Sequence, residues 1–288
     1  MSIEVKNVTY VYMPKTPFER VALADVSLTI PEGSFTAIAG HTGSGKSTLV
    51  QHLNGLITPT SGEVLVDGVN IGDRSKTGRQ QAQKARQQVG MVFQYAENQL
   101  FEETIAADIA FGPANQELSA EEIDQRVREA MGIVGLDYDT YHDRSPFSLS
   151  GGQMRRAAIA GVLAMRPKYL VLDEPAAGLD PSGREELLQQ IKRLHKEQNM
   201  TIVMVSHSME DIAKLADNVI IMAQGKVAAQ GTPREVFAQD NLLRQAGLRP
   251  PQIAVMMQRL SAAGLPVNAH VLTPEEGLQS LLEVFHVK

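Results

Sequence analysis

Short apolar runs alternate with amphipathic segments through the middle of the chain. Runs of strand length stand at residues 35–39, 89–93, 169–172 and 201–205, and each holds few polar side chains. The segments between them carry apolar residues at helical spacing, as in the stretch that follows Asp180. Strands that alternate with helices in this way are typical of a parallel sheet covered by helices, so the pattern predicts an α/β fold.

The first 75 residues add a different pattern to this one. Apolar and polar residues alternate over residues 3–12 and 21–30, which predicts antiparallel strands. Residues 62–71 predict a hairpin that turns at Asp67-Gly68. In the first strand, strict alternation would place one set of side chains on one face, namely Ile3, Val5, Asn7, Thr9 and Val11.

Helical spacing continues through the second half of the chain. Asp180 caps one helix and Pro181 occupies its first turn, while Ser119 begins a capping-box pattern with Glu122. Residues 73–88 are polar and fit either a solvated helix or a mobile loop. Further helices are predicted at residues 104–143, 154–163, 209–216 and 233–246, and a last short helix at Thr273-Pro274-Glu275-Glu276.

Two consecutive prolines mark a domain boundary. Pro250-Pro251 interrupts the helical pattern, so we expect a main domain at residues 1–245 and a small appendage at residues 246–288. The appendage is rich in apolar residues. It fits a dimerisation element and packing on its own domain equally well.

Composition excludes several functional classes. The chain has 288 residues, of which 43% are hydrophobic, enough for a packed core. The net charge of −6 argues against a nucleic-acid partner, and the absence of cysteine excludes disulfides and thiolate metal sites. We expect no signal peptide, and no apolar run approaches the roughly 20 residues that cross a bilayer.

One glycine-rich stretch carries the clearest chemistry. It matches the phosphate-binding pattern G-x-x-x-x-G-K-[ST] and lies between a predicted strand and a predicted helix. Its glycines let backbone N–H groups point at phosphate oxygens, and the helix that follows adds its positive end. Lys46 supplies a charge for the β- and γ-phosphates, and the Ser47 hydroxyl is suited to Mg²⁺. The stretch is Gly40-His41-Thr42-Gly43-Ser44-Gly45-Lys46-Ser47-Thr48.

Four more polar residues stand directly after predicted strands. They are Gln94, Asp173, Glu174 and His207. Because the carboxyl ends of parallel strands share one edge of a sheet, we expect these side chains to converge on Lys46. Asp173 would hold Mg²⁺, Glu174 would polarise an attacking water, Gln94 could touch the metal and the water, and His207 could donate to the γ-phosphate.

Each of these residues also has a plain structural interpretation. An Asp-Glu pair after a strand is often a helix cap, and Gln94 or His207 alone would be a weak signal. An aromatic residue that ends the first strand could stack on a base. Tyr12 is the candidate, with Tyr10 as the competing choice and ordinary strand packing as the alternative for both.

A second glycine-rich element decides the class. Leu149-Ser150-Gly151-Gly152-Gln153 precedes a helical run and is itself suited to an anion. With the phosphate loop, this segment resembles the signature of the nucleotide-binding domain of ATP-binding cassette (ABC) proteins, over about residues 3–240. The resemblance implies a P-loop ATPase with a RecA-like core, an antiparallel β-subdomain, a helical subdomain at about residues 95–165, and bound ATP with Mg²⁺.

The resemblance also implies roles for individual residues. Tyr12 matches the base-stacking aromatic residue, Gln94 the Q-loop glutamine and His207 the switch histidine. The family works as a head-to-tail dimer, so Ser150, Gly151, Gly152 and Gln153 would serve ATP bound by another chain. Gly178-Leu179-Asp180 matches the D-loop, but Ala177 stands where a serine is usual, which puts a serine contact across the dimer in doubt.

The segment after Gln94 narrows the resemblance to the ATPases of energy-coupling factor (ECF) transporters, and to the second of their two paired ATPases. The chain reads Phe93-Gln94-Tyr95-Ala96-Glu97-Asn98-Gln99-Leu100-Phe101, and later Phe111-Gly112-Pro113. This implies import of vitamins or transition-metal ions from a place on the cytoplasmic face of the membrane. The implied partners are a sister ATPase, a membrane-embedded substrate-binding subunit, and a transmembrane coupling subunit that docks near residues 95–113.

Two other classes compete with this interpretation. One is a soluble ABC ATPase of translation or DNA repair, which would usually carry a second cassette or a long coiled coil. The other is a switch that binds nucleotide without hydrolysis, which we would expect to lack either Glu174 or His207. The sequence shows no second cassette and no long coiled coil, and it contains both Glu174 and His207.

Overall fold

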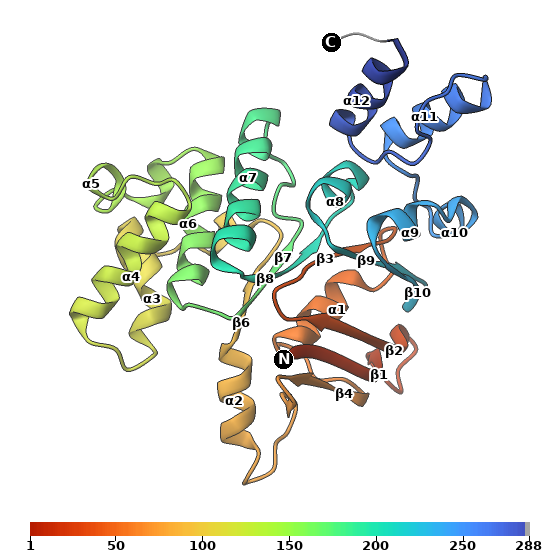
Figure 1. The fold of residues 1–288 in the computed structure, drawn as a ribbon. Coiled ribbons are helices and arrows are strands. Elements are labelled where there is room, and N and C mark those ends of the chain that lie inside the picture. Colours follow the sequence, from red (N-terminus) through yellow and green to blue (C-terminus); the bar gives the residue numbers. More distant parts are fainter. Residues whose placement is uncertain (286–288) are drawn as a thin grey trace.

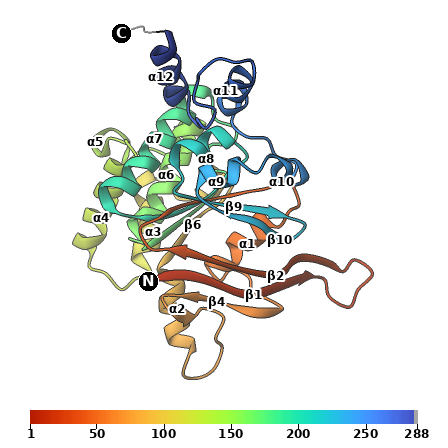
Figure 2. The same cartoon turned by 45° about the vertical axis from the view of Figure 1, so that its right-hand side comes forward.

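Two sheets stacked on each other form the body of the protein, as the computed structural model of residues 1–285 shows (Figures 1 and 2). The smaller sheet is antiparallel, in the order β2-β1-β4-β5, and the larger has the order β10-β9-β3-β8-β7-β6. All neighbours in the larger sheet are parallel except β10 and β9, so the predicted α/β fold is confirmed. The strands are β1 (Ser2–Tyr12), β2 (Arg20–Pro31), β3 (Phe35–Ala39), β4 (Ser61–Val66), β5 (Val69–Asn70), β6 (Val89–Val92), β7 (Tyr169–Asp173), β8 (Thr201–Val205), β9 (Asn218–Ala223) and β10 (Lys226–Gly231).

Helices cover the larger sheet and fill the space between the sheets. Helix α1 packs Leu49, Val50 and Leu53 into a core shared by both sheets. The helices are α1 (Lys46–Leu53), α2 (Arg79–Gln87), η1 (Ala96–Gln99), α3 (Ile105–Ala114), α4 (Ala120–Ile133), α5 (Tyr138–Tyr141), η2 (Pro146–Ser148), α6 (Gly151–Ala164), α7 (Pro181–Gln198), α8 (Met209–Leu215), α9 (Pro233–Phe237), α10 (Asp240–Gln245), α11 (Gln252–Ala262) and α12 (Pro274–Phe285).

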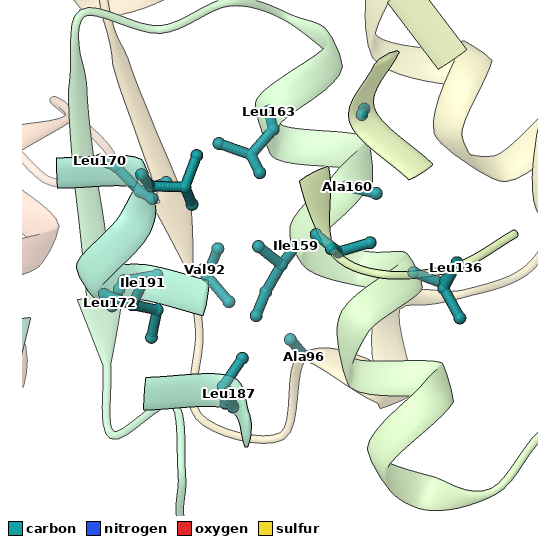
Figure 3. Packing of buried hydrophobic residues seen from close by; sticks show 14 of the residues in the cluster. Val92, Ala96, Leu136, Ile159, Ala160, Leu163, Leu170, Leu172, Leu187 and Ile191 are labelled. Atoms are coloured by element: carbon teal, nitrogen blue, oxygen red, sulfur yellow. The ribbon is translucent and has the colours of Figure 1, made fainter. Parts of the chain in front are cut away.

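A large apolar core joins β6, β7 and β8 to the helices between residues 95 and 198. Figure 3 shows Val92, Ile159 and Leu187 pointing into this common core. These side chains come from a strand, from α6 and from α7, and all three are almost completely buried. The core therefore fixes the ends of three strands relative to α6, which matters because polar residues follow those strands.

The first strand departs from strict alternation. Ile3 and Val5 are buried as expected, but the next fully buried residue is Val8 rather than Asn7. Asn7 has a φ of 49°, and the pairing of β1 with β2 shifts between Val5 and Val8. This bulge turns the strand over by one residue, so the prediction that Ile3, Val5, Asn7, Thr9 and Val11 share one face is wrong beyond Val5.

Several predicted helices are split or shifted. The helix expected at residues 233–246 is two helices, because a straight helix would carry Phe237 and Leu243 on different sides, whereas both are buried in one core. The region 104–143 is divided at Asn115 and again at Gly135, whose φ is 70°. The polar stretch at residues 73–88 does contain a helix, α2.

The C-terminal helices α11 and α12 pack on each other around Met257 and Val271. Ala254 and Leu272 join the core that lies beneath α9 and α10, and Arg234 of α9 forms an ion pair with Glu276 of α12. The predicted cap of the last helix is present, since the Glu276 N–H donates to the Thr273 hydroxyl. Among residues 1–285, no helix combines the length and apolar character that crossing a bilayer requires.

Candidate functional site

The glycine-rich loop leads from β3 into α1 and lies between the two sheets. A Cβ atom on Gly40 would come within 2.3 Å of the Met222 carbonyl oxygen on β9, and one on Gly45 within 2.7 Å of the Ala22 carbonyl oxygen on β2. Gly45, with a φ of 104°, is also the N-cap residue directly before α1. Any larger residue at these positions would push the loop away from the sheets, so glycine is required by contact as well as by conformation.

A cavity of about 400 Å³ opens above this loop. Its wall combines the loop with residues from β1, β2 and the segments after β6, β7 and β8. The lining residues are Tyr12, Arg20, Ala22, Thr42, Gly43, Gly45, Lys46, Ser47, Thr48, Gln94, Glu174 and His207. Of the predicted loop residues, Gly40, His41 and Ser44 do not contribute to this wall.

Lys46 points back along the loop. Its Nζ donates to the carbonyl oxygens of Gly40, at 2.8 Å, and His41, at 3.2 Å. Burial lowers the pKa of Lys46, while the carboxylates of Glu174 and Asp173 act in the opposite direction. The lysine is thus a cation held on the floor of the cavity, where a phosphate group could replace the carbonyl oxygens as its partner.

Glu174 connects two of the other predicted residues. Its Oε2 accepts from Gln94 Nε2 at 3.1 Å, and its Oε1 lies 2.8 Å from His207 Nε2. Glu174 has a φ of 51°, a conformation that is uncommon for residues other than glycine and that is found at functional sites. The three side chains come from the ends of β6, β7 and β8, so the expected convergence at the edge of the sheet is observed.

Asp173 lies deeper, at the end of β7. Its side chain is buried, and its Oδ1 has no hydrogen-bond partner among the described residues. Burial raises the pKa of Asp173, whereas the Ser47 hydroxyl and the Lys46 charge lower it. The unpaired Asp173 oxygen and the neighbouring Ser47 hydroxyl are hard oxygen ligands, and the Gln94 amide lines the same cavity as Ser47, so the residues fit Mg²⁺ held jointly with phosphates.

Tyr12 rather than Tyr10 faces the cavity. The Tyr12 hydroxyl lies 3.2 Å from Thr48 Oγ1, and 40% of the side chain is exposed. Tyr10 instead packs edge-on against Tyr12 and against His52, with both pairs of ring centroids 4.9 Å apart. The geometry thus leaves the Tyr12 ring available for a base and places Tyr10 behind it.

The second glycine-rich element lies elsewhere. Ser150 caps α6 in a reciprocal capping box, in which its hydroxyl accepts from Gln153 N and its own N–H donates to Gln153 Oε1. None of Ser150, Gly151, Gly152 and Gln153 lines the Lys46 cavity. Asp180 likewise caps α7 by accepting from Ser182 and Gly183. The structure does not bring these residues to the phosphate loop of their own chain.

Two features of the site are absent from the sequence-based prediction. Arg20 lines the cavity because it pairs with Tyr12 across the β1–β2 hairpin. The connection between the two strands is long, so this pairing could not be predicted from the sequence. Arg155 of α6 is buried and joins three segments. It donates to both carboxylate oxygens of Glu97, at 2.8 and 3.0 Å, and to the carbonyl oxygens of Pro175 and Ala177.

A phosphate loop at the end of β3, with a carboxylate pair at the end of β7, a parallel strand separated from β3 by β8, defines the class of P-loop ATPases. Known proteins agree with this class. The sequence profile described as "ABC transporter" matches residues 23–177.

Relatives of known name narrow the class further. An energy-coupling factor transporter ATP-binding protein, EcfA2, from Clostridium perfringens is 54% identical over 99% of this chain and 98% of its own length. EcfA2 from Bacillus licheniformis is 50% identical over 99% of this chain and 98% of its own length. The chain belongs to this family, the energy-coupling factor transporter ATP-binding proteins among the ABC transporters.

Solved structures share the fold. CbiO1 from Clostridium perfringens, part of the ABC transporter complex CbiONQ, superimposes with a TM-score of 0.73 and 40% identity, covering 89% of this chain and 98% of its own. The ATP-binding cassette MJ0796, dimeric and bound to ADP and phosphate after hydrolysis, gives a TM-score of 0.70 and 31% identity, covering 80% of this chain and 98% of its own.

Proposed function

We propose that this chain is the ATP-binding and hydrolysing subunit of an ECF importer, which drives uptake of a vitamin, another micronutrient or a transition-metal ion. Family membership and the fold support the ATPase. The observation that carries hydrolysis is the contact of Glu174 with both Gln94 and His207 above the Lys46 loop. A switch that only binds nucleotide would not need a carboxylate oriented from two sides.

Each residue then has one task. Lys46 and the loop N–H groups bind the β- and γ-phosphates, and Tyr12 stacks on the base. Ser47, Asp173 and Gln94 would hold Mg²⁺, which neutralises charge on the phosphates when it is bound. Glu174 polarises the attacking water, and His207 donates to the γ-phosphate. Most of the rate enhancement then comes from positioning and charge stabilisation.

The signature segment supports action as a pair. Because Ser150 to Gln153 stand outside the Lys46 cavity, we propose that they, together with Asp180, contact ATP held by a sister ATPase in a head-to-tail dimer. The N-terminus of α6 suits phosphate oxygens there. Closure of the dimer around ATP and reopening after hydrolysis would supply the movement that drives import.

An exposed aromatic surface next to the Q-loop favours a membrane partner. Phe101 and Phe111 pack edge-on with ring centroids 5.0 Å apart, and more than half of each side chain is exposed, as is that of Tyr95. Exposed aromatic residues grouped in this way are typical of interfaces. We propose that residues 95–113 receive a helix of a transmembrane coupling subunit, which would hold this chain peripherally at the cytoplasmic face of the membrane beside a substrate-binding subunit.

The test is the Glu174→Gln variant, tagged and recovered from membranes of the source cells in the presence of ATP and Mg²⁺. We expect it to bind ATP with nearly normal affinity and to hydrolyse it roughly 100-fold more slowly, the size typical for loss of a general base. A sister ATPase and a membrane protein should co-purify. Recovery of ribosomes or repair factors with no membrane protein would keep the ATPase and overturn the transport assignment.

Two variants separate the parts of this proposal. Lys46→Ala should lose ATP binding itself, so unchanged affinity would remove Lys46 from the site. Phe101→Glu should keep ATP binding and lose the membrane protein from the purified complex. If it kept the membrane protein, the docking surface would lie elsewhere while the ATPase proposal would stand.

A further inference from the structure

A second cavity, of about 550 Å³, lies at the other end of α1 from the phosphate loop. Its wall is built from the C-terminal end of α1, the connection to β4, and the segment from Ile71 into α2. Within residues 1–285 it shares no lining residue with the nucleotide cavity. The volume lies in the range of small-molecule sites.

Three arginines give this cavity a strongly positive wall. Arg74 donates to the Thr58 hydroxyl at 3.2 Å, and Arg86 donates to the Ile71 carbonyl oxygen at 2.6 Å, which leaves most of their N–H groups free. Arg79 stands at the first position of α2. None of the three forms an ion pair with the described residues.

The one carboxylate in the wall is already engaged. Asp73 Oδ1 accepts from the Ser75 N–H at 2.8 Å, and this hydrogen bond is the main reason that the pKa of Asp73 is lowered. The arginines form no ion pair with it among the described residues, and the wall carries three positive charges against the one negative charge of Asp73. Three free guanidinium groups around one hollow favour an anion with several oxygen atoms, as phosphate esters have.

A buried histidine lies in the same wall. His52 is 1% exposed, and its Nδ1 lies 2.7 Å from the Thr48 carbonyl oxygen, so Nδ1 carries the proton. Burial lowers the pKa of His52, which keeps the ring neutral. Its Nε2 is then an acceptor, and among residues 1–285 it has no hydrogen-bond partner. A buried polar atom of this kind is uncommon unless something else satisfies it.

We propose that this cavity is a second ligand site, which takes a phosphate ester. The phosphate would bind Arg74, Arg79 and Arg86. A soluble sugar or glycerol phosphate has this chemistry, and so does the headgroup of an anionic phospholipid. The experiment below distinguishes these two sources.

The cavity also has a short physical route to the nucleotide site. His52 contacts the ring of Tyr10, which packs on Tyr12, and the Thr48 that accepts from His52 also meets the Tyr12 hydroxyl. All these contacts lie on α1 or on the β1 strand beside it. These contacts are a route by which occupation of one cavity could alter the other, and any effect on affinity must be reciprocal.

The direct test is calorimetric titration of glycerol 3-phosphate into protein saturated with ADP and Mg²⁺, which fill the phosphate loop. We expect saturable binding that the Arg74→Gln/Arg79→Gln variant weakens roughly tenfold or more, since charge-assisted hydrogen bonds are lost. The matched control, Lys192→Gln/Arg193→Gln, removes two charges from the exposed side of α7 and should bind normally. Uncharged glycerol should not bind.

A parallel arm measures sedimentation with vesicles of phosphatidylglycerol, compared with phosphatidylcholine. The site would be assigned to a lipid headgroup if the protein bound the anionic vesicles but not glycerol 3-phosphate. That binding should be lost in the Arg74/Arg79 variant and kept in the Lys192/Arg193 variant. Absence of binding in both arms, or equal losses in the two double variants, would overturn the proposal.

Discussion

At the scale of single residues, Asp173 is under opposing demands. Its carboxylate is buried at the end of β7, and one oxygen has no partner among the described residues. Such a charge costs stability in the protein alone, yet it is the group that a metal ion would require. Residues placed for function at the expense of stability are expected at catalytic sites.

This conflict predicts that Asp173→Asn stabilises the protein without ligands while abolishing Mg²⁺-dependent ATP hydrolysis. Removing about 1 kcal/mol of unfavourable burial would raise Tm by about 2–4 °C for a chain of this length. The measurement is thermal unfolding without nucleotide, beside an ATPase assay. An unchanged or lower Tm would show that the charge is compensated.

The sign of the pH dependence follows from the raised pKa of Asp173. The folded protein holds this proton more tightly than the unfolded chain, so the contribution of Asp173 to stability is full below its ordinary pKa of 3.8 and is lost as pH rises through the raised value. The Asn variant should lack this loss. Burial raises the pKa of Asp211 as well, but Arg184 forms an ion pair with this carboxylate, so Asp211→Asn should lower Tm by leaving Arg184 without its partner.

Single residues also show where sequence reasoning reaches its limit. Gln94, Glu174 and His207 stand within two residues of a strand end, and Lys46 ends the loop that follows β3, so the topology of a parallel sheet was enough to predict that they meet. Arg20 could not be found in this way. Its place in the wall depends on the register of a hairpin whose connection is seven residues long, and sequence does not determine such a register.

At the scale of elements, one side chain links the helical region to the catalytic edge of the sheet. Arg155 on α6 holds Glu97 in η1 and the two carbonyl oxygens of the segment between Glu174 and Asp180. Helix α6, which Ser150 caps, is thereby attached to the segment that follows Gln94 and to the segment that follows Glu174. Movement of α6 would be transmitted to these loops through this guanidinium group as well as through the shared apolar core.

Arg155→Met tests this link. Glu97 and two carbonyl oxygens would lose their donor, and breaking a buried pair of this kind costs about 3–5 kcal/mol. We expect a clear fall in the free energy of unfolding and in turnover. Arg155→Lys should recover the charge without recovering both Glu97 contacts, so turnover should stay low while stability is partly restored.

The neighbouring Arg156 provides the control. It pairs with Glu186, whose carboxylate is largely exposed, and such a pair contributes at most about 1 kcal/mol. Urea unfolding of Arg156→Met should therefore differ little from the parent protein. Equal losses in the two methionine variants would mean that Arg155 acts only through general packing.

Whether a segment forms a strand or a helix could be predicted from sequence more reliably than where that strand or helix bends or breaks. Strands β3, β6, β7 and β8 stand where apolar runs predict them, because a strand buried on both faces leaves a continuous apolar signal. The bulge at Asn7 and the break between α9 and α10 left no comparable signal. Both depend on which distant residues share a core, which is tertiary information.

At the scale of the whole molecule, the appendage presents an apolar face that residues 1–285 do not cover. Leu278, Leu282 and Phe285 recur at helical spacing on α12 and are exposed, and Met256 on α11 is exposed as well. Leu281 on the same helix packs inward. The sequence left two roles open for the appendage, dimerisation and packing on its own domain. The side of α12 that carries Leu281 packs on the appendage itself. We propose that the exposed side of α12 contacts a paired ATPase.

Leu278→Glu/Leu282→Glu should therefore weaken pairing without changing the fold. We expect the sedimentation coefficient of an equimolar mixture with the sister ATPase to fall toward that of single chains, while Tm of the isolated chain changes by no more than about 1 °C. An unchanged sedimentation profile would leave α12 with no part in pairing.

The separation of Ser150 from the Lys46 cavity has a consequence for gene expression. If each chain supplies half of an active site to its neighbour, a surplus of one chain adds no catalyst, however well it folds. What a cell must control is then the ratio of the two ATPases rather than the amount of either. Tight linkage of their synthesis, in one transcript with matched translation, would be the economical arrangement, and a copy with a damaged Glu174 would interfere with sound partners.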